Sequence, residues 1–283
     1  MKKSYSIFHP SVFYFIFLVW ITVFLGLKVN GQGNINVNPR RVIFEGQKRI
    51  IELNVNNDSQ DSAKYVISFV QIRMTEDGVM QWITTPDSGQ KFADKYVRVF
   101  PRTVLLGPGN TQIVRLQMAR TDQLESGEYR SHLYFKSLVP QKALGAEDIN
   151  KNTGVFLNIE ATFGLTIPVI IRVGESTTFL KISNIKVESV ADGTKKLQLT
   201  LNRTGNMSLY GEVTVFYISP GGKETQIGIL GNVAVYTPNT LLNLTIDLDK
   251  NQNFDLSKGK IRVVYSSKSG VKTEKIAEAE LVL

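Results

Sequence analysis

The sequence predicts an all-β protein built from two β-sandwich domains. The chain has 283 residues, enough for two domains of ordinary size. Short segments in which apolar and polar residues alternate recur along it, for example at 51–55 and 114–118. Glycine-rich turns separate them, as at 107–109 and 220–222, and no amphipathic helical pattern follows the N-terminal segment. Many short strands with frequent turns are typical of sandwiches and barrels.

The composition fits a globular protein that folds without disulfides. Hydrophobic residues make up 42% of the chain, charged residues make up 20%, and cysteine is absent. The two cores must therefore provide the stability. The formal charge of +8 falls to about +5 when the N-terminal segment and its three lysines are removed. This mild, scattered positive charge argues against a nucleic-acid partner.

Residues 1–33 are predicted to be a cleavable secretory signal peptide. Lysines at positions 2 and 3 precede an almost unbroken apolar run over residues 12–27. About 16 apolar residues are fewer than the roughly 20 that a membrane-spanning helix needs. Cleavage after Gly31 or Gly33 is therefore favoured over an uncleaved anchor, and we expect an exported protein with no membrane anchor after processing.

A domain boundary is expected at the Gly-Glu-Ser sequence 174–176. The N-terminal domain then covers residues 34–173 and the C-terminal domain covers residues 177–283. The alternating pattern restarts beyond the boundary. The strands expected in the second domain are 180–187, 195–201, 212–218, 242–248, 260–266 and 272–283.

The longest alternating segment precedes this boundary. Every odd position from Val155 to Ile171 is apolar, over a length well beyond the usual five or six residues of a strand. A strand this long either spans two sheets or presents part of its apolar row to another protein. Residues 140–153, directly before it, show no alternation and are predicted to form a mobile loop that could gate an exposed sheet edge.

The sequence shows no sign of an enzyme. His132 is the only histidine after the signal segment, and without cysteine there is no thiol nucleophile and no Cys-ligated zinc. The residues around His132 read as a strand, and no Gly-X-Ser-X-Gly motif is present. The acidic residues are scattered, and no pair is singled out. We therefore expect no catalytic residue, no cofactor and no metal.

Two adjacent arginines are the basic residues of interest. Arg40 and Arg41 follow Pro39 on the first expected strand and precede a turn at residues 45–46. The planar guanidinium group can bind a carboxylate through two hydrogen bonds, so an arginine near a domain cleft could hold a chain terminus. The alternative is a solvated charge that protects an edge strand from aggregation.

Several segments of the first domain occur in a characteristic order. They are NVNPRRVIFEGQKRIIELNVNN, VFPRTVLLGPGNTQIVRLQ and GEYRSHLYFKSL, followed by the long alternating segment. Together they resemble the periplasmic pilus-assembly chaperones of the PapD-like family. The resemblance covers about residues 35–173 and is weaker in the second domain, where NRTGNMSLYGEVTVFY is similar. The combination of Leu-Gly-Pro-Gly with Ile-Val-Arg-Leu is its most specific part.

The resemblance implies two immunoglobulin-like domains in a boomerang arrangement. It also implies a periplasmic chaperone that lends the last strand of its first domain to a pilus, fimbrial or related secreted β-sandwich subunit. This donor-strand complementation is a form of strand addition. An outer-membrane usher would be a further partner. The side chains that would enter the client are Leu157, Ile159, Ala161, Phe163 and Leu165.

The resemblance further implies that Arg41, with Arg40 as a substitute, holds the C-terminal carboxylate of the client. The family's second anchor, a lysine, is replaced here by Pro168, which lacks the N–H that a strand residue donates. The family's interdomain ion pair keeps its arginine as Arg172. The position of its acid aligns with Arg130, so an acid from the second domain would have to intervene.

Two other interpretations remain. The chain could be an immunoglobulin-like adhesin or envelope scaffold, in which Trp82, Tyr96 and Phe100 stack on a ligand, although packing in the core is favoured for them. The long segment could instead be an ordinary core strand, in which case its odd side chains are all covered. A dimer in which each copy caps the free edge of the other is a further alternative for the chaperone.

Overall fold

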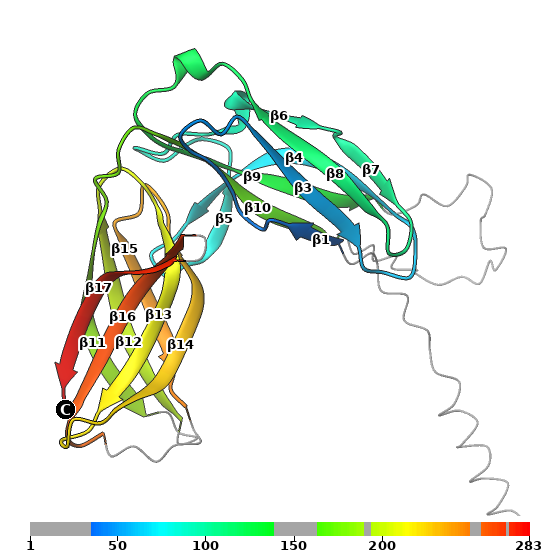
Figure 1. The fold of residues 1–283 in the computed structure, drawn as a ribbon. Coiled ribbons are helices and arrows are strands. Elements are labelled where there is room, and N and C mark those ends of the chain that lie inside the picture. The colour runs from blue at the N-terminus through cyan, green and yellow to red at the C-terminus, as the bar shows by residue number, and fades with distance from the viewer. Residues whose placement is uncertain (1–34, 139–162, 190–193, 250–255, 270–271) are drawn as a thin grey trace, which may run out of the picture.

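In the part of the chain that the structure describes, the regular secondary structure is almost entirely β-strand. Two single-turn 3-10 helices, η1 (Asp94–Tyr96) and η2 (Thr121–Gln123), interrupt the strands. Figure 1 shows two bodies of strands that meet at an angle and give the chain a boomerang outline. The all-β fold with two sandwiches is therefore confirmed. The computed structural model describes residues 35–138, 163–189, 194–249, 256–269 and 272–283.

The N-terminal sandwich consists of two sheets formed by the strands up to β10. Every second side chain of these strands faces the shared core, as the period of a β-strand requires. The first sheet has the order β1 (Ile35–Asn38), β3 (Ile50–Asn57), β8 (Thr111–Met118) and β6 (Val97–Phe100). The second has the order β2 (Val42–Phe44), β10 (Gly164–Val173), β9 (Gly127–Leu138), β4 (Ala63–Met74) and β5 (Met80–Ile83), with β7 (Thr103–Leu106) beside β4.

The C-terminal sandwich contains all six strands that the sequence predicted and one more. The additional strand is β14, whose alternation is interrupted by Gly228 and Gly231 and whose register shifts twice against β13. One sheet has the order β11 (Phe179–Ser189), β12 (Lys195–Thr204) and β15 (Leu241–Asp247). The other has the order β14 (Glu224–Val235), β13 (Leu209–Ile218), β16 (Lys260–Ser269) and β17 (Lys272–Val282).

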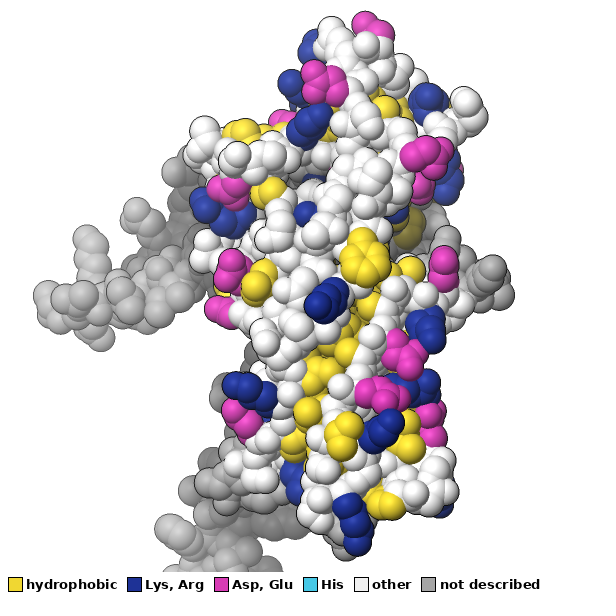
Figure 2. Space-filling model, turned by 90° about the vertical axis from the view of Figure 1, so that its left-hand side faces the viewer, with side chains coloured by type: hydrophobic (Ala, Val, Ile, Leu, Met, Phe, Trp, Pro, Cys, Tyr) yellow, Lys and Arg dark blue, Asp and Glu magenta, His cyan; other side chains and the backbone are white. Residues whose placement is uncertain are grey.

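The two sheets of the C-terminal sandwich meet along a seam between β11 and β17. Figure 2 shows an apolar strip that runs down the side of the molecule on which these two strands lie. Half-buried apolar residues of both strands pack there against the second core, among them Ile185, Val187, Ile276 and Leu281. The strip is therefore the outer margin of that core.

The two sandwiches are packed against each other and not merely linked. Ile170 of β10 is fully buried, and its side chain belongs to the core of the C-terminal sandwich, together with Met74. The hairpin of β4 and β5 is bonded to the same sandwich. Asn239 donates to the carbonyl of Met74 at 2.5 Å, and the N–H of Asn243 donates to the carbonyl of Glu76 at 2.7 Å. These contacts restrict how far one sandwich can turn relative to the other.

Several expectations concern residues outside the described ranges. They are the signal segment 1–33, the loop 140–153, and Leu157, Ile159 and Ala161 in the first part of the long alternating segment. Within the described ranges, no helix has the length and apolar character needed to cross a membrane.

Candidate functional site

The register between β9 and β10 determines which way the backbone of β10 faces. The N–H of Ser137 donates to the carbonyl of Phe163 at 3.0 Å, and the pairing continues in step along both strands. In an antiparallel pair, residues bonded in this way alternate with residues whose N–H and C=O point to the opposite side. Gly164, Thr166 and Pro168 therefore direct their backbone groups away from β9.

Only part of this outer edge of β10 is covered by a described strand. β2 pairs in parallel with residues 169–171, whereas β1, which precedes β2, pairs with β3 in the other sheet. No strand within the described ranges pairs with residues 164–168 at this edge, which we call the open edge. Such an edge is the surface to which a strand of another protein can be added. Pro168 lies at this edge, where its missing N–H removes no bond to β9.

The apolar row of β10 passes from the core into solvent. Ile167, Val169 and Ile171 are fully buried in the N-terminal core, and Leu165 is partly buried against it. Phe163, the next residue in the row, is 53% exposed. The row therefore continues beyond the sandwich that it helps to build, and the interpretation of the segment as a wholly covered core strand fails at Phe163.

An aromatic pair supports the start of the open edge. The ring of Tyr134 lies where a side chain at Gly164 would project, so that a Cβ added there would overlap it. Trp82 of β5 meets the Tyr134 ring edge-on, with 5.2 Å between the ring centroids. The space beside the glycine in β10 is therefore filled by a ring on the neighbouring strand, as is known for glycines in sheets.

Arg40 and Arg41 lie in the bend between β1 and β2, where the chain crosses from one sheet to the other, and not on a strand. Nη1 of Arg41 donates to the hydroxyl of Tyr236 at 2.9 Å, and its guanidinium carbon lies 4.5 Å from the ring centroid of Tyr210. Both tyrosines belong to the C-terminal sandwich. The structure thus places Arg41 in the interdomain junction, whereas Arg40 is exposed to solvent.

Arg130, on the outer face of β9, is buried beside Arg41. It donates to the carbonyls of Ile72 and Thr237, each at 3.2 Å, and so joins the two sandwiches. Its guanidinium carbon lies 4.2 Å from the ring centroid of Tyr236. Burial lowers the pKa of Arg130, and the positive charge of Arg41 acts in the same direction.

His132 follows two residues later on the same face, directly opposite Pro168 in the register of β9 and β10. It lies in a strand, as expected, and its side chain is buried. Burial, followed by repulsion from the Arg130 and Arg41 guanidinium groups, lowers its pKa to about 3. The imidazole of His132 is therefore neutral at physiological pH.

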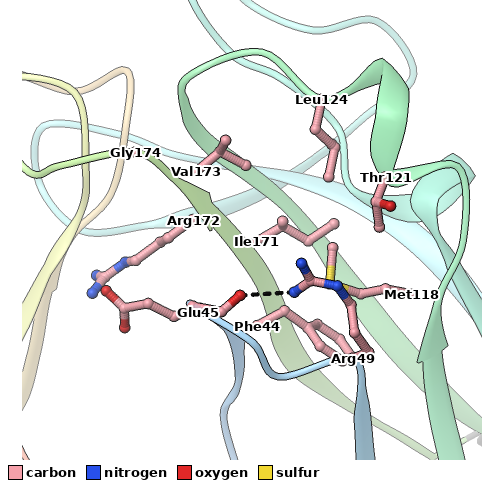
Figure 3. A pocket seen from close by; sticks show the side chains of 11 residues that line it. Phe44, Glu45, Arg49, Met118, Thr121, Leu124, Ile171, Arg172, Val173 and Gly174 are labelled. Carbon is pink, nitrogen blue, oxygen red and sulfur yellow. Dashed lines mark hydrogen bonds between the residues drawn. The ribbon is translucent and has the colours of Figure 1, made fainter.

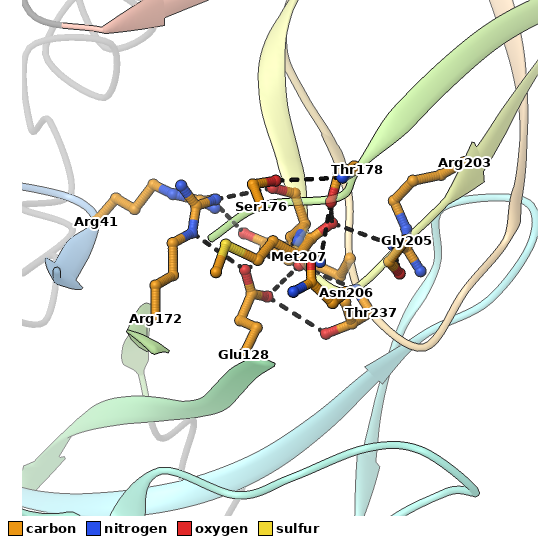
Figure 4. A network of polar contacts seen from close by, with 12 residues as sticks. Arg41, Glu128, Arg172, Ser176, Thr178, Arg203, Gly205, Asn206, Met207 and Thr237 are labelled. Atoms are coloured by element: carbon orange, nitrogen blue, oxygen red, sulfur yellow. Dashed lines mark hydrogen bonds and ion pairs between the residues drawn. The ribbon is translucent and has the colours of Figure 1, made fainter. Parts of the chain in front are cut away.

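The ion pair of Arg172 is present, but both partners lie in the N-terminal sandwich: the acid is Glu128 of β9, which is neither at the aligned position of Arg130 nor in the second domain. Nε of Arg172 lies 3.3 Å from the carboxylate of Glu128, which is fully buried. Figure 4 shows that Glu128 points into the C-terminal sandwich, where it accepts hydrogen bonds from the backbone and hydroxyl of Ser208 and from the hydroxyl of Thr237. Glu128 precedes Arg130 by two residues and shares its face of the strand. The alignment had placed Arg130 next to Arg172, where the two positive charges would repel each other. Because Glu128 lies opposite Arg172 instead, this repulsion does not arise.

A cavity of about 190 Å³ opens at the end of the N-terminal sandwich next to Gly174. Figure 3 shows that its walls include Phe44, Met118 and Ile171, so it is mainly an opening in the apolar core. Arg49 at its margin already donates to the carbonyl of Gly46 at 2.8 Å. The guanidinium of Arg49 is thus engaged locally, unlike that of Arg41, which reaches across the junction.

The three aromatic residues considered for stacking on a ligand differ in position. Tyr96 is buried in the N-terminal core, as the packing interpretation expected. That interpretation is wrong for Trp82 and Phe100, which are 59% and 77% exposed. They lie on β5 and β6, in different sheets, and so do not form one surface. In the described ranges, no three His, Cys, Asp or Glu side chains are grouped closely enough to hold a metal ion.

The residues of the second sandwich that complete the junction were not predicted from the sequence. Tyr210 and Tyr236 contact Arg41, and Ser208 and Thr237 contact Glu128. Tyr210 lies on β13 and Ser208 directly before it, whereas Tyr236 and Thr237 follow β14. All four are distant in sequence from the residues that they contact. A tyrosine or serine at these positions has no local pattern that would distinguish it from a packing residue.

Comparison with protein-family models and with curated proteins found no match for this chain. Solved structures do match. A chain of the CsuC–CsuE chaperone–tip adhesion subunit pre-assembly complex of Acinetobacter baumannii has a TM-score of 0.45 at 14% identity, over 87% of this chain and 97% of that chain. The E. coli chaperone DraB gives 0.44 at 14% identity, over 88% and 97%. The Pseudomonas aeruginosa CupB2 chaperone gives 0.43 at 12%, over 88% and 100%. Each is described as a chaperone or a chaperone complex, and scores of this size do not by themselves assign a function.

Proposed function

We propose that the protein is a periplasmic chaperone that completes the fold of pilus, fimbrial or related secreted β-sandwich subunits by donor-strand complementation. The observation that carries this proposal is the open edge of β10. There, backbone groups of Gly164 and Thr166 that no described strand pairs with lie beside an apolar row that leaves the core at Phe163. Main-chain bonds at such an edge provide affinity, and alternate side chains fill the groove of the client.

The physical benefit to the client follows from the same geometry. A sandwich that lacks a strand exposes an apolar groove and an unpaired edge, and both promote aggregation. A strand lent by the chaperone covers both at once. Leu165 is anchored against the core of the chaperone, whereas Phe163 and the apolar residues before it would enter the client.

Arg41 is proposed to receive the C-terminal carboxylate of the client. It stands at the junction close to β2, which ends the open edge, so a client strand running along β10 would bring its terminus towards it. Arginine provides the two parallel donors that a carboxylate accepts. Arg40 is exposed and is assigned no contact with the client.

Location and further partners belong to the same proposal. The predicted signal peptide directs the chain to the periplasm, and an outer-membrane usher would receive the loaded subunit. A dimer that caps the open edge in the absence of a client is the state expected to compete with client binding. Size-exclusion chromatography with and without client distinguishes monomer from capped dimer.

Site-specific photocrosslinking tests the donor strand. A photoreactive residue at position 163 should crosslink to small secreted β-proteins in the periplasm, and Phe163→Asp should lose these proteins in a pull-down. Phe100 is the matched control, because it is an exposed phenylalanine in the other sheet. Crosslinks at position 100 that equal those at position 163, or undiminished capture by Phe163→Asp, would contradict the mechanism.

The location of the partner separates the chaperone from an adhesin or envelope scaffold. A chaperone releases its client and is absent from the finished fibre, whereas an adhesin remains at the cell surface with its ligand. Arg41→Ala should weaken capture, while Arg40→Ala should leave it unchanged. Equal effects of the two substitutions would remove the assigned role of Arg41 but leave the strand mechanism standing.

A further inference from the structure

Three side chains that can carry positive charge surround Tyr236 at the interdomain junction. The guanidinium carbons of Arg130 and Arg41 lie 4.2 and 5.3 Å from the Tyr236 ring centroid, and the His132 ring centroid lies 6.4 Å from it. Arg130 and His132 are 2% and 3% exposed. The N-terminal sandwich thus presents its buried cationic groups to one tyrosine of the C-terminal sandwich.

Four nitrogen atoms of these side chains are buried and have no hydrogen-bond partner among the described residues. They are Nε and Nη2 of Arg41, Nε of Arg130 and Nδ1 of His132. A buried polar nitrogen that makes no hydrogen bond destabilises the protein, and a charged one does so more strongly. Such a concentration of unused nitrogen atoms is the arrangement expected of a site that receives an acceptor.

Among the described residues, no acid at this place neutralises the charge. Glu128 is the acidic side chain that acts on Arg130, but its oxygens are already bonded to Arg172, Ser208 and Thr237. Arg41 instead lowers the pKa of Arg130 through repulsion. The junction therefore carries unbalanced positive charge that an anion would stabilise.

We propose that Arg41, Arg130 and His132 together form a carboxylate-binding site at Tyr236. A basic residue at position 168 could provide a second positive group, but this position is a proline. In this site Arg130 and His132 provide that second positive group instead. His132 is directly opposite Pro168 in the register of β9 and β10. The identity of the ligand as the C-terminal carboxylate of a client rests on the proposed function, whereas the preference for a carboxylate follows from the side chains themselves.

The site can open at Arg41. This side chain is less buried than Arg130 and His132, and its one hydrogen bond to another described side chain is the one to Tyr236. Arg130 is held on both sides by backbone carbonyls and stays in place. A carboxylate that displaces the Tyr236 contact would meet Arg41 from one side and Arg130 and His132 from the other.

Binding at this site is coupled to protonation of His132. The charged and titratable groups that face it are Arg130 on its own strand, Arg41 from the bend before β2 and Tyr236 from the C-terminal sandwich. Its partners across the sheet, Pro168 and Val70, are uncharged. Both arginines oppose its protonation, and a bound carboxylate would favour it. Affinity should therefore rise as the pH falls towards the higher pKa of the bound state.

Proton NMR of the histidine rings tests this coupling in the full chain. The chain contains two histidines, so His132→Gln identifies the signal of His132 by its loss. The probes are N-acetylglycylglycine, which has a free carboxylate, and its C-terminal amide. The carboxylate probe should raise the pKa of His132 from about 3 by roughly 2–3 units. The amide should not change it.

The same shift predicts the pH dependence of binding. A bound-state pKa near 5–6 makes the carboxylate probe bind about two- to tenfold more tightly at pH 5 than at pH 7.5. His132→Gln should remove this dependence, and Arg41→Gln should weaken binding at every pH. Arg40→Gln, which alters the neighbouring exposed arginine, should change neither.

If every histidine signal of the unsubstituted protein titrates identically with the carboxylate and with the amide, the proposal is overturned, and this comparison holds even if His132→Gln fails to fold. Binding that is equally pH-dependent in His132→Gln also overturns it. Failure here and failure of the chaperone function can be told apart. A protein that captures clients but shows no shift of the His132 pKa loses only this site, and one that binds the probe but captures no client loses only the chaperone function.

Discussion

The two halves of β10 have the same alternating sequence but opposite surroundings. From Val169 onwards the strand lies between β2 and β9, with one face in the N-terminal core and Ile170 in the C-terminal core. From Gly164 to Pro168 it pairs with β9 alone among the described strands, and the row of apolar side chains reaches solvent at Phe163.

The difference shows how one strand can serve both stability and binding. Pairing with β9 sets the direction and register of both halves, because ten successive residue pairs run without a shift from Gly164 to Val173. The open half then presents a preformed edge, so the entropy of ordering it is not lost when a partner strand binds. The following substitutions test whether the two halves really differ in this way.

The largest effect is expected for Ile170→Asp in the covered half. The side chain is fully buried between the two sandwiches, so an uncompensated carboxylate there should lower the free energy of unfolding by about 4–5 kcal/mol or more. Urea unfolding followed by circular dichroism measures the loss. Ile170→Val is the control and should cost only about 1 kcal/mol. A stable Ile170→Asp protein would show that the sandwiches do not share this contact.

Glu128→Gln should have the next largest effect. The amide of the variant would keep one acceptor oxygen but lose the charge that holds Arg172 at 3.3 Å, and its nitrogen would be a buried donor without a suitable partner. We expect a loss of roughly 1–3 kcal/mol in the free energy of unfolding. The matched control is Glu52→Gln, which removes an exposed pair with Arg115 at 2.8 Å and should cost less than about 1 kcal/mol. Equal losses would mean that the buried network adds nothing to the junction.

Gly164→Ala tests the start of the open half. The added methyl group would overlap the ring of Tyr134, which must move away from the strand. Because the ring lies at the end of a flexible side chain, we expect a loss of about 1 kcal/mol in stability. A double-mutant cycle with Tyr134→Ala should show that this loss disappears when the ring is removed. Additive effects would exclude the contact as its cause.

The smallest effect on stability is expected for Phe163→Asp. The side chain is more than half exposed, so the free energy of unfolding should change by less than about 0.5 kcal/mol, in contrast to the same type of change at Ile170. The measurement is again urea unfolding, now paired with client capture. A loss of several kcal/mol would mean that Phe163 belongs to the core and would erase the difference between the halves.

Much of the fold was accessible from the sequence because its signals are local. Alternation over a few residues predicted the strands around Leu53, Val114 and Leu197, and turn residues separated them. β14 was missed because Gly228 and Gly231 break its pattern, and it is held as a strand by pairing with β13. Trp82 and Phe100 were assigned to the core because aromatic residues usually lie there, but their strands turn these positions outwards.

The site was accessible only in part. The apolar row of β10 could be recognised from the sequence, and the family resemblance singled out Arg41, which the structure places at the interdomain junction. The partner of Arg172 was misplaced by two residues, because a shift of two keeps a side chain on the same face of a strand and local pattern cannot detect it. Arg130 then proved to be a junction residue in its own right.

The all-β class, the alternation of β10 and the charges available at its ends can be recognised without a structure, since they depend on residues that are neighbours in the chain. Three features depend on the folded chain: β2 stops covering β10 at Val169, Glu128 contacts Arg172, and Tyr236 lies beside Arg41, Arg130 and His132. These contacts join segments many residues apart, and the packing of one sandwich against the other sets them.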